Sequence, residues 1–426
     1  MKRLLLVFFL LFLVCGCACA ADEEAPDITL ECTFSQSGKA IRSQGSMLDR
    51  DYNTYVAISP HKSLEAVSPE KMIGGVFIQF HDRTVKSTLE ALVKGNWKKV
   101  ADCGDYLTEW FAVPYGTTAV RLNNNSRSRM FINELYVFGI GVQPSYAAKW
   151  HTGKKCDLML VSCHPDDEVL WFGGLLPTYA RERGYEVQVV VVVPSTPQRR
   201  LELLDSLWHC GVTRYPRLLG IGDSHHGSLH EQYKAWSKDS VCFSIVKSIR
   251  MYQPAVIVSH DLYGEYGHGA HMATADCTRL AFNYAASPKK YAKTAKEYGT
   301  WQAQKLYLHL YAENQIEMDW HQPLESFGGK DGYTVAAEAF QYHRSQLKAW
   351  TIEDGGKLSN ARFGLVYTTV GEDVAKNDFM ENTGIVPHPE NRFVPEKPLG
   401  PVEEDTSSSD DTDSPLHITL ESGGDT

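Results

Sequence analysis

The seven residues 187–193, Val-Gln-Val-Val-Val-Val-Val, constrain the fold more than any other stretch of the chain. A strand that is apolar on both faces belongs inside a parallel sheet that helices cover on both sides. Shorter apolar runs recur at 158–162, 218–221, 256–259 and 306–310, with helical patterns between them, as at 174–183 and 199–210. This alternation predicts an α/β domain over residues 154–386, with a Rossmann-like, doubly wound and mostly parallel sheet.

Residues 28–142 have a different pattern. Short apolar runs lie between turn residues, and no helical period separates them; examples are the runs 76–80, 87–93, 119–122 and 135–138. Strands at this spacing predict an all-β sandwich as a separate domain.

Composition supports two folded domains and argues against one class of partner. The chain has 426 residues, of which 43% are hydrophobic and 22% are charged, which is enough to bury a core in each domain. Its net charge of -10 and scattered Lys and Arg residues argue against a nucleic-acid partner, because phosphate binding needs clustered positive charge. Oligomeric state has no signature in the sequence.

The N-terminus predicts an export signal within residues 1–20. Lys2 and Arg3 precede an apolar run, 4–14, that is too short to span a bilayer. The sequence allows two interpretations of how this signal is processed. Cleavage after Ala18-Cys19-Ala20 would release a secreted protein, whereas Val14-Cys15-Gly16-Cys17 resembles a lipobox and would tether the protein to a membrane through a lipidated Cys17. The second is favoured, because cysteine is otherwise unusual in a cleavage region, and both place the protein outside the cell or on its surface.

The last residues, 387–426, are rich in Pro, Ser, Asp and Glu and poor in apolar residues. Such a composition predicts a disordered acidic tail.

Seven of the ten cysteines lie beyond the predicted signal, and none forms a Cys-x-x-Cys pair. Their spacing excludes a cysteine zinc knuckle. We expect mostly buried free thiols, with one bridge between Cys32 and Cys103.

Polar residues gather where the first strand of the α/β region ends. The apolar run 158–162 leads directly into Cys163-His164-Pro165-Asp166-Asp167-Glu168. In doubly wound sheets the functional site lies at the carboxyl ends of the strands. A turn with an aspartate helix cap is the alternative explanation, but packing alone does not call for so many titratable groups.

A second polar cluster follows the run 256–259, and reads Gly264-Glu265-Tyr266-Gly267-His268-Gly269-Ala270-His271. His268 and His271 are three residues apart at the start of a helical pattern, so they can face the same side. The topology brings this cluster towards His164. Two histidines and a carboxylate suit a catalytic zinc ion, which takes three protein ligands and keeps one position open for water.

These motifs carry a family resemblance. His164-Pro165-Asp166-Asp167-Glu168 after an apolar strand, followed by His268-x-x-His271, resembles the PIG-L/LmbE-like de-N-acetylases. Arg199-x-x-Glu202 and His343-Arg344-Ser345-Gln346 are further matches, and the resemblance covers roughly residues 154–350.

The resemblance implies a role for each matching residue. His164, Asp167 and His271 would bind zinc, and a His and carboxylate set also permits Fe²⁺. Asp166 would be the general base, and His268 would stabilise the oxyanion or protonate the leaving amine. Tyr266 would lie near the substrate carbonyl, although a packed loop aromatic is its plainer explanation.

One departure from the family concerns His268. Many members read His-Pro-Asp-His where this chain has Ala270, so the carboxylate that could keep His268 protonated is missing. Glu265 or Asp261 would have to replace it.

Several other residues allow two interpretations, a functional role or a purely structural one. Arg199 and Asp223 are candidate substrate-binding residues, although Arg199 and Glu202 could simply form an ion pair on a helix surface. We expect the remaining candidates to be structural or solvated: Cys163 as a buried thiol, His225 and His226 in a solvated loop, and His343 in an amphipathic helix.

The β region also resembles a known module. The motifs at 48–55, 75–80 and 132–139 resemble a discoidin-like, galactose-binding-like β-sandwich. Such modules often bind glycans, and some hold Ca²⁺ near the first motif.

These observations predict an exported, zinc-dependent hydrolase that removes the N-acetyl group from an N-acetylglucosamine-type glycoconjugate. Its β domain would hold it on a glycan. Two alternatives stay open: an amidohydrolase of a non-sugar acylated amine, and a glycan-binding surface protein with a degenerate catalytic domain.

Overall fold

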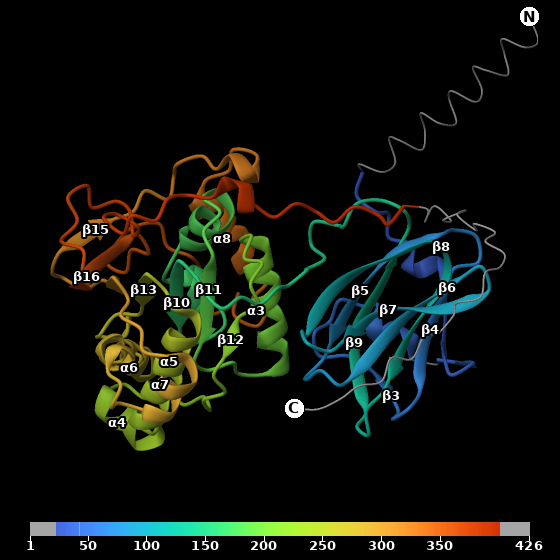
Figure 1. Ribbon diagram of the computed structural model, residues 1–426, viewed down its shortest axis with the longest axis horizontal. Helices are drawn as coiled ribbons and strands as arrows, with labels where there is room; N and C mark the ends of the chain where they lie inside the picture. The colour runs from blue at the N-terminus through green and yellow to red at the C-terminus, as the bar shows by residue number, and fades with distance from the viewer. Residues whose placement is uncertain (1–22, 42, 401–426) are drawn as a thin grey trace, which may run out of the picture.

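The computed structural model describes residues 23–41 and 43–400. The predicted signal, with Cys17, and residues 401–426 of the predicted tail lie outside the described residues. Two bodies lie side by side, an all-β domain and an α/β domain (Figure 1).

The β domain consists of one antiparallel sheet with the strand order β2-β1-β4-β8-β5-β9-β3, to which β6 and β7 are added through β8. Its strands are β1 (Thr33–Gln36), β2 (Lys39–Ala40), β3 (Val56–Ile58), β4 (Ser63–Val67), β5 (Ile73–Phe80), β6 (Ser87–Val93), β7 (Asn96–Cys103), β8 (Thr108–Asn124) and β9 (Met130–Phe138), with two 3-10 turns, η1 (Thr29–Glu31) and η2 (Gln44–Met47). The start of β8 pairs with β5 and its end with β4 and β6, so the sheet curls into a half-barrel.

The alternating sequence pattern explains the core of this domain. In β6 every second residue from Ser87 to Val93 is buried. In β5, by contrast, all eight residues are buried. Val76, Ile78 and Phe80 lie in the hydrophobic core, and Phe77 and Gln79 line a cavity that residues of the α/β domain complete.

The α/β domain has a seven-stranded sheet with the order β12-β11-β10-β13-β14-β16-β15. The first five of these strands are parallel, and β16 and β15 are antiparallel additions at one edge. The strands are β10 (Leu158–Ser162), β11 (Val187–Val191), β12 (Arg217–Leu218), β13 (Val256–Ser259), β14 (Lys305–His309), β15 (Gln315–Glu317) and β16 (Arg362–Thr368). In β11 all five residues are buried, as its apolar sequence predicts.

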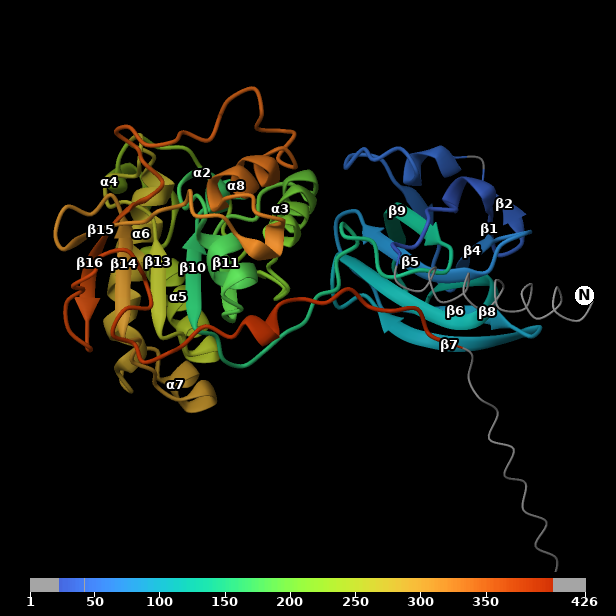
Figure 2. The ribbon, with the colours of Figure 1, turned by 90° about the horizontal axis from the view of Figure 1, so that it is seen from above.

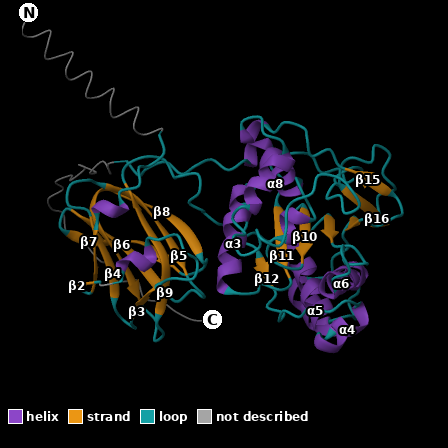
Figure 3. Ribbon diagram, turned by 180° about the vertical axis from the view of Figure 1, so that it is seen from behind, coloured by secondary structure: helices purple, strands orange, loops and turns teal. Residues whose placement is uncertain are grey.

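Helices cover both faces of this sheet (Figures 2 and 3). They are α2 (Asp167–Leu170), α3 (Pro197–His209), α4 (Leu229–Ala235), α5 (Lys238–Tyr252), α6 (Gly269–Ala286), α7 (Ala292–Tyr298) and α8 (Gly332–Phe340), with the π-helix η3 (Pro177–Glu182) and the 3-10 turns η4 (Glu325–Phe327) and η5 (Pro389–Asn391). Alternate residues of the strands supply two cores: Leu158 and Leu160 pack with α3 residues, and Met159 and Val161 pack with residues of α5 and α6. No helix of the described residues is long and apolar enough to cross a membrane.

Two local predictions need correction. The helix expected at 174–183 exists mainly as the six-residue π-helix η3, and at Gly173 and Gly174 a side chain would meet Asn360, Trp320 and Gly332. The helix expected to carry His343 ends at Phe340, and His343 lies in the turn that follows.

The predicted disorder of 387–426 is wrong for residues 388–396. Arg392 pairs with Glu182 at 2.9 Å, and the Phe393 ring contacts Trp208 at a centroid distance of 4.8 Å. The Gln143 N–H donates to the Glu396 carbonyl. Scattered aromatic and basic residues anchor this segment although its overall composition is that of a linker.

The predicted bridge between Cys32 and Cys103 is also wrong, since all seven cysteines of the described residues are free and buried. Cys242 of α5 donates a hydrogen bond to Cys277 of α6, and their sulfur atoms lie 2.9 Å apart.

Candidate active site

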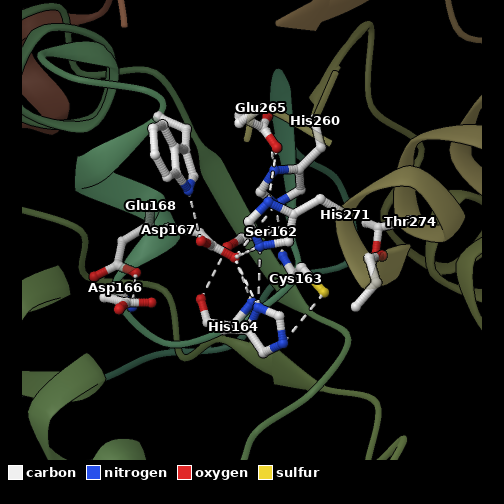
Figure 4. Close-up of polar contacts among 12 residues, drawn as sticks. Ser162, Cys163, His164, Asp166, Asp167, Glu168, His260, Glu265, His271 and Thr274 are labelled. Atoms are coloured by element: carbon white, nitrogen blue, oxygen red, sulfur yellow. Dashed lines mark hydrogen bonds and ion pairs between the residues drawn. The ribbon is translucent and has the colours of Figure 1, made fainter. Parts of the chain in front are cut away.

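Three ligand atoms converge at the carboxyl end of the parallel strands (Figure 4). His164 Nδ1 lies 3.3 Å from Asp167 Oδ2 and 3.2 Å from His271 Nε2, and His271 Nε2 lies 3.4 Å from Asp167 Oδ2. Two ligands bonded at 2.0–2.1 Å to a tetrahedral zinc ion lie about 3.3–3.4 Å apart. The three atoms therefore have the spacing of three corners of a zinc tetrahedron.

The chain reaches this geometry through a strained turn. His164 and Asp167 flank Asp166, which has a φ of 115°. A positive φ is costly for a residue with a side chain, and such strain is held by surrounding contacts. Here the buried Glu168 supplies them: it accepts from the Asp166 N–H at 2.8 Å, from Ser206 at 2.8 Å and from His343 at 2.6 Å.

Asp167 is oriented from two sides. Its Oδ1 accepts from the Trp171 indole at 2.8 Å, and its Oδ2 accepts from the His164 N–H at 2.7 Å while facing the two ligand histidines. Burial raises its pKa, but the nearby His271, His260 and His164 outweigh burial and hold the pKa of Asp167 far below its usual range.

Behind His271 lies a fully buried carboxylate, Glu265. Its Oε2 accepts from His271 Nδ1 at 2.7 Å, and its Oε1 contacts His260 and His309 at 3.1 Å each. A hydrogen on Nδ1 of His271 leaves the lone pair of Nε2 free for a metal. Burial opposes ionisation, but the histidine contacts hold the pKa of Glu265 well below its usual range.

The Asp166 carboxylate faces the pocket beside the ligand set, and Arg199 Nη2 lies 2.9 Å from its Oδ1. Burial and the charge of Asp167 raise the pKa of Asp166 to about 7, against the opposing effect of Arg199 and His343. The expected surface pair of Arg199 with Glu202 is therefore wrong. Glu202 is buried and accepts instead from the backbone and hydroxyl of Ser345.

His268 lies between two rings, with the His225 centroid at 4.6 Å and the Tyr266 centroid at 5.6 Å. Burial and the charges of His271 and His164 lower the pKa of His268 to about 3. Its Nδ1 is buried without a hydrogen-bond partner among the described residues. Glu265 serves His271, so it does not replace the carboxylate missing at Ala270, and no hydrogen bond or ion pair of the described residues joins Asp261 to His268 either.

His164, Asp166, Asp167, Arg199 and His268 line a pocket of about 190 Å³, and His271 lies behind its wall. Asp223 lies at its rim, with Oδ1 3.5 Å from His164 Nε2. His225 lies in an exposed loop, as expected, and also lines the pocket, whereas His226 contributes its carbonyl to the Gly269 N–H. Tyr266 packs against Trp350 and Trp171 at 4.7 and 5.8 Å, so it is both a packed ring and a pocket wall.

Sequence reasoning missed His260, His309 and Trp350. His260 directly follows β13 and His309 ends β14, so the rule that pointed to His164 also marks these two strand ends. Trp350 lies in a segment without regular structure, four residues after Gln346 of the last matching motif, but nothing in that motif singled it out.

The residues present fit a catalytic metal ion. Only two groups of three or more His, Cys, Asp or Glu side chains in the described ranges bring ligand atoms within 4.8 Å of one another, and both are here: Cys163 with His164, Asp167 and His271, and His260 with Glu265 and His271. Burial raises the pKa of the Cys163 thiol, and its sulfur lies near His164 Nε2 rather than Nδ1. Three ligands therefore remain, with the pocket on the open side. The calcium prediction for the β domain gains no support from the described residues.

Comparisons with known proteins agree with these motifs. Residues 159–282 match the family model described as "PIG-L: GlcNAc-PI de-N-acetylase". A 1D-myo-inositol 2-acetamido-2-deoxy-alpha-D-glucopyranoside deacetylase 1 from Frankia casuarinae is 29% identical over 39% of this chain and 64% of its own length. The protein of the same description from Frankia alni is 32% identical over 34% of this chain and 59% of its own length. The chain thus spans less than two thirds of both relatives.

Among solved structures, N,N'-diacetylchitobiose deacetylase from Pyrococcus horikoshii matches 45% of this chain and 72% of that chain, with 18% identity and a TM-score of 0.36. The family match and the Frankia relatives thus show that residues 159–282, which carry the motifs at His164 and His271, are similar to de-N-acetylases of the PIG-L type.

Proposed function

We propose that this chain is an exported, metal-dependent hydrolase that removes the acetyl group from an N-acetylglucosamine-type glycoconjugate. The observation that carries the proposal is the triangle of His164 Nδ1, Asp167 Oδ2 and His271 Nε2 beside the Asp166 carboxylate. The names of the Frankia relatives describe deacetylases of an acetamido sugar, which supports a sugar acetamide as the substrate. Export rests on residues 1–20 alone.

His164, Asp167 and His271 would hold zinc, and their oxygen and nitrogen donors also suit Fe²⁺. When bound, such an ion acidifies water and polarises a carbonyl oxygen. Glu265 and Trp171 keep two of the three ligands oriented before the ion arrives.

Asp166 would act as the general base. Its carboxylate faces the pocket, where it can accept a proton from the water that attacks the acetyl carbon and return it to the leaving nitrogen. Arg199 holds the carboxylate in place at 2.9 Å and favours its ionised form. A cation bound at Asp167 would favour that form further.

His268 would donate a hydrogen bond to the oxyanion that forms on the acetyl carbonyl. Burial and the charges of His271 and His164 hold the pKa of His268 low and favour a neutral ring, and no carboxylate of the described residues is hydrogen-bonded to it. A neutral imidazole can donate a hydrogen bond, but it cannot supply a proton to the amine. Tyr266 is a second donor on the same side of the pocket.

The test measures bound metal and acetate release from N-acetylglucosaminides for the native protein and Asp166→Asn. We expect about one zinc ion per chain in both and a loss of activity of at least about a hundredfold in the variant, because general-base catalysis contributes about 10²–10⁴-fold. Asp102→Asn, on the exposed face of β7, is the matched control.

Three outcomes would contradict the proposal. Full activity in Asp166→Asn would contradict the role of Asp166 as general base. A native protein that binds no metal would contradict the metal centre. Release of acetate only from acylated amines without a sugar moves the substrate to the alternative amidohydrolase class.

A further inference from the structure

A second cavity, of about 270 Å³, lies between the two domains. The β domain supplies Arg50, Tyr52, Glu134 and Tyr136, and the α/β domain supplies Asp205 of α3 and Arg344. Pockets for drug-sized ligands have volumes of about 300–1,000 Å³, so this one suits a somewhat smaller molecule.

Contacts between the domains hold the cavity walls in place. The Tyr52 hydroxyl donates to Asp205 at 2.6 Å, and Arg344 Nη1 donates to the Arg50 carbonyl at 2.8 Å. The Arg344 guanidinium also lies over the Tyr52 ring, 5.1 Å from its centroid. The cavity is therefore formed before any ligand binds, which lowers the entropic cost of binding.

Glu134 is the unusual member of the wall. It is 3% exposed, and its nearest donors are the Tyr136 hydroxyl and the Arg50 N–H, which lower its pKa against the effect of burial. Neither donor makes a well-formed hydrogen bond with a Glu134 oxygen among the described residues. Buried polar groups are nearly always paired, because an unpaired one loses its hydration without compensation. Hydroxyl groups of a ligand would supply the missing donors.

The charges of the cavity indicate what kind of ligand it takes. Two carboxyl groups, Glu134 and Asp205, line the cavity together with two guanidinium groups, Arg50 and Arg344, so its wall offers both hydrogen-bond acceptors and donors and does not favour one sign of ligand charge. The tyrosine rings offer flat apolar faces between these polar groups. A pyranose has the matching character, with an apolar C–H face and hydroxyls around its edge, as pocket ligands combine apolar contact with a few placed hydrogen bonds.

One segment links this cavity to the metal pocket. Tyr342 and Arg344 line the cavity, whereas Gln346 and Trp350 line the metal pocket. Two residues span at most about 7 Å, so Arg344 and Gln346 lie close together. His343 and Ser345, between them, are fixed by hydrogen bonds to the buried Glu168 and Glu202.

We propose that the interdomain cavity binds a neutral pyranose unit of the same glycan whose acetamide reacts in the metal pocket. This inference rests on the proposed function, and it makes both domains part of one substrate site. An oligosaccharide would then bind more tightly than a single sugar, because its second unit reaches Glu134 and Arg344.

The test uses the full chain and β-linked N-acetylglucosamine oligomers of one to four units. Binding is measured by calorimetry on Asp166→Asn, and KM and kcat for acetate release are measured on protein with Asp166 intact. Glu134→Gln keeps the side-chain shape but weakens the acceptor, and Arg344→Met keeps the stem over Tyr52 but removes the donors. Glu65→Gln in β4, whose carboxylate accepts a hydrogen bond from the Ser63 hydroxyl at 3.1 Å and which does not line the cavity, is the matched control.

We expect Glu134→Gln and Arg344→Met to weaken binding of the trimer and tetramer, and to raise KM for them, by about tenfold, the equivalent of one good hydrogen bond to a charged group. The kcat, the KM of the single-sugar substrate and all constants of Glu65→Gln should stay unchanged. The inference is overturned if the oligomers bind no more tightly than the monosaccharide, or if Glu134→Gln behaves as the native protein. It is also overturned if the single sugar alone depends on Glu134, since the cavity would then hold a free sugar.

Failure of the proposed function gives a different result. Oligomer binding that depends on Glu134 without acetate release from any substrate would contradict the hydrolase and leave the cavity as a glycan site. Acetate release with oligomer binding that is indifferent to Glu134 would contradict the cavity alone.

Discussion

The two regions that bury acidic side chains treat them in opposite ways. At the metal edge Asp167 and Glu265 each hold partners on both carboxylate oxygens. In the interdomain cavity Glu134 has no well-formed partner on either oxygen. The pKa values follow: contacts with histidines lower those of Asp167 and Glu265, whereas burial raises that of Glu134 to about 7.

The difference teaches what each site is built for. Carboxylates with fixed partners are oriented before a cation arrives, so the metal ligands need little rearrangement. A carboxylate without a partner costs stability until a ligand supplies donors.

The largest effect should come from removing a metal ligand. His271→Ala deletes one of three ligand atoms and leaves Asp167 and Glu265 facing an empty space. We expect stoichiometric zinc to be lost and acetate release to fall by at least about a thousandfold, since metal, base and oxyanion donors act as a unit. Atomic absorption after dialysis and an acetate assay check this. Retention of one tightly bound zinc ion would show that the ligand set is wrong.

A smaller effect should come from Glu265→Gln, which keeps the ligand but disturbs its orientation. The amide cannot stabilise the Nδ1–H tautomer of His271 as a carboxylate does. Loss of such a partner costs about 10–100-fold in metal affinity. Competition with a zinc chelator measures it, and Glu325→Gln, exposed on η4, is the control. An unchanged affinity would mean that the partners at this edge serve packing alone.

The smallest effect should be on stability. Whereas the two substitutions at the metal site weaken a function, Glu134→Gln in the interdomain cavity should stabilise the folded protein. Because the pKa of Glu134 is raised in the folded protein, from 4.5 to about 7, its ionisation lowers stability as pH rises through this interval. Glu134→Gln should therefore be more stable than the native protein at pH 8, by at most about 3 kcal/mol, and equally stable below pH 4.5. Urea unfolding at both pH values tests it. A less stable variant at pH 8 would show that the carboxylate already has a partner, such as a cation.

Much of the architecture could be predicted from the sequence, because it depends on local patterns. The apolar run 187–193 marks an interior strand, and the strand-end rule placed His164 and His271 at one edge. The role of Glu265 could not be predicted, since its partners His260, His309 and His271 come from the ends of two strands, β13 and β14, and from helix α6. The ion pair of Arg199 with Asp166 could not be predicted for a related reason: helix periodicity shows which face a residue occupies, but not that Asp166 lies opposite that face.

The cavity and the segment around Arg392 had no sequence signal. Both depend on how the two domains pack, and single residues such as Phe393 and Tyr52 make those contacts. The composition of a segment does not show the effect of a few anchoring residues. For this reason residues 388–396 were expected to be disordered, although Arg392 and Phe393 hold them in place.

The most direct test of the central claim is a crystal structure of the zinc-loaded protein with anomalous data at the zinc edge. We expect one strong peak at about 2.0–2.2 Å from His164 Nδ1, His271 Nε2 and one Asp167 oxygen, with the Asp166 carboxylate beside it but outside bonding distance. A peak bound elsewhere, or one that takes Cys163 or Asp166 in place of these ligands, would contradict the account.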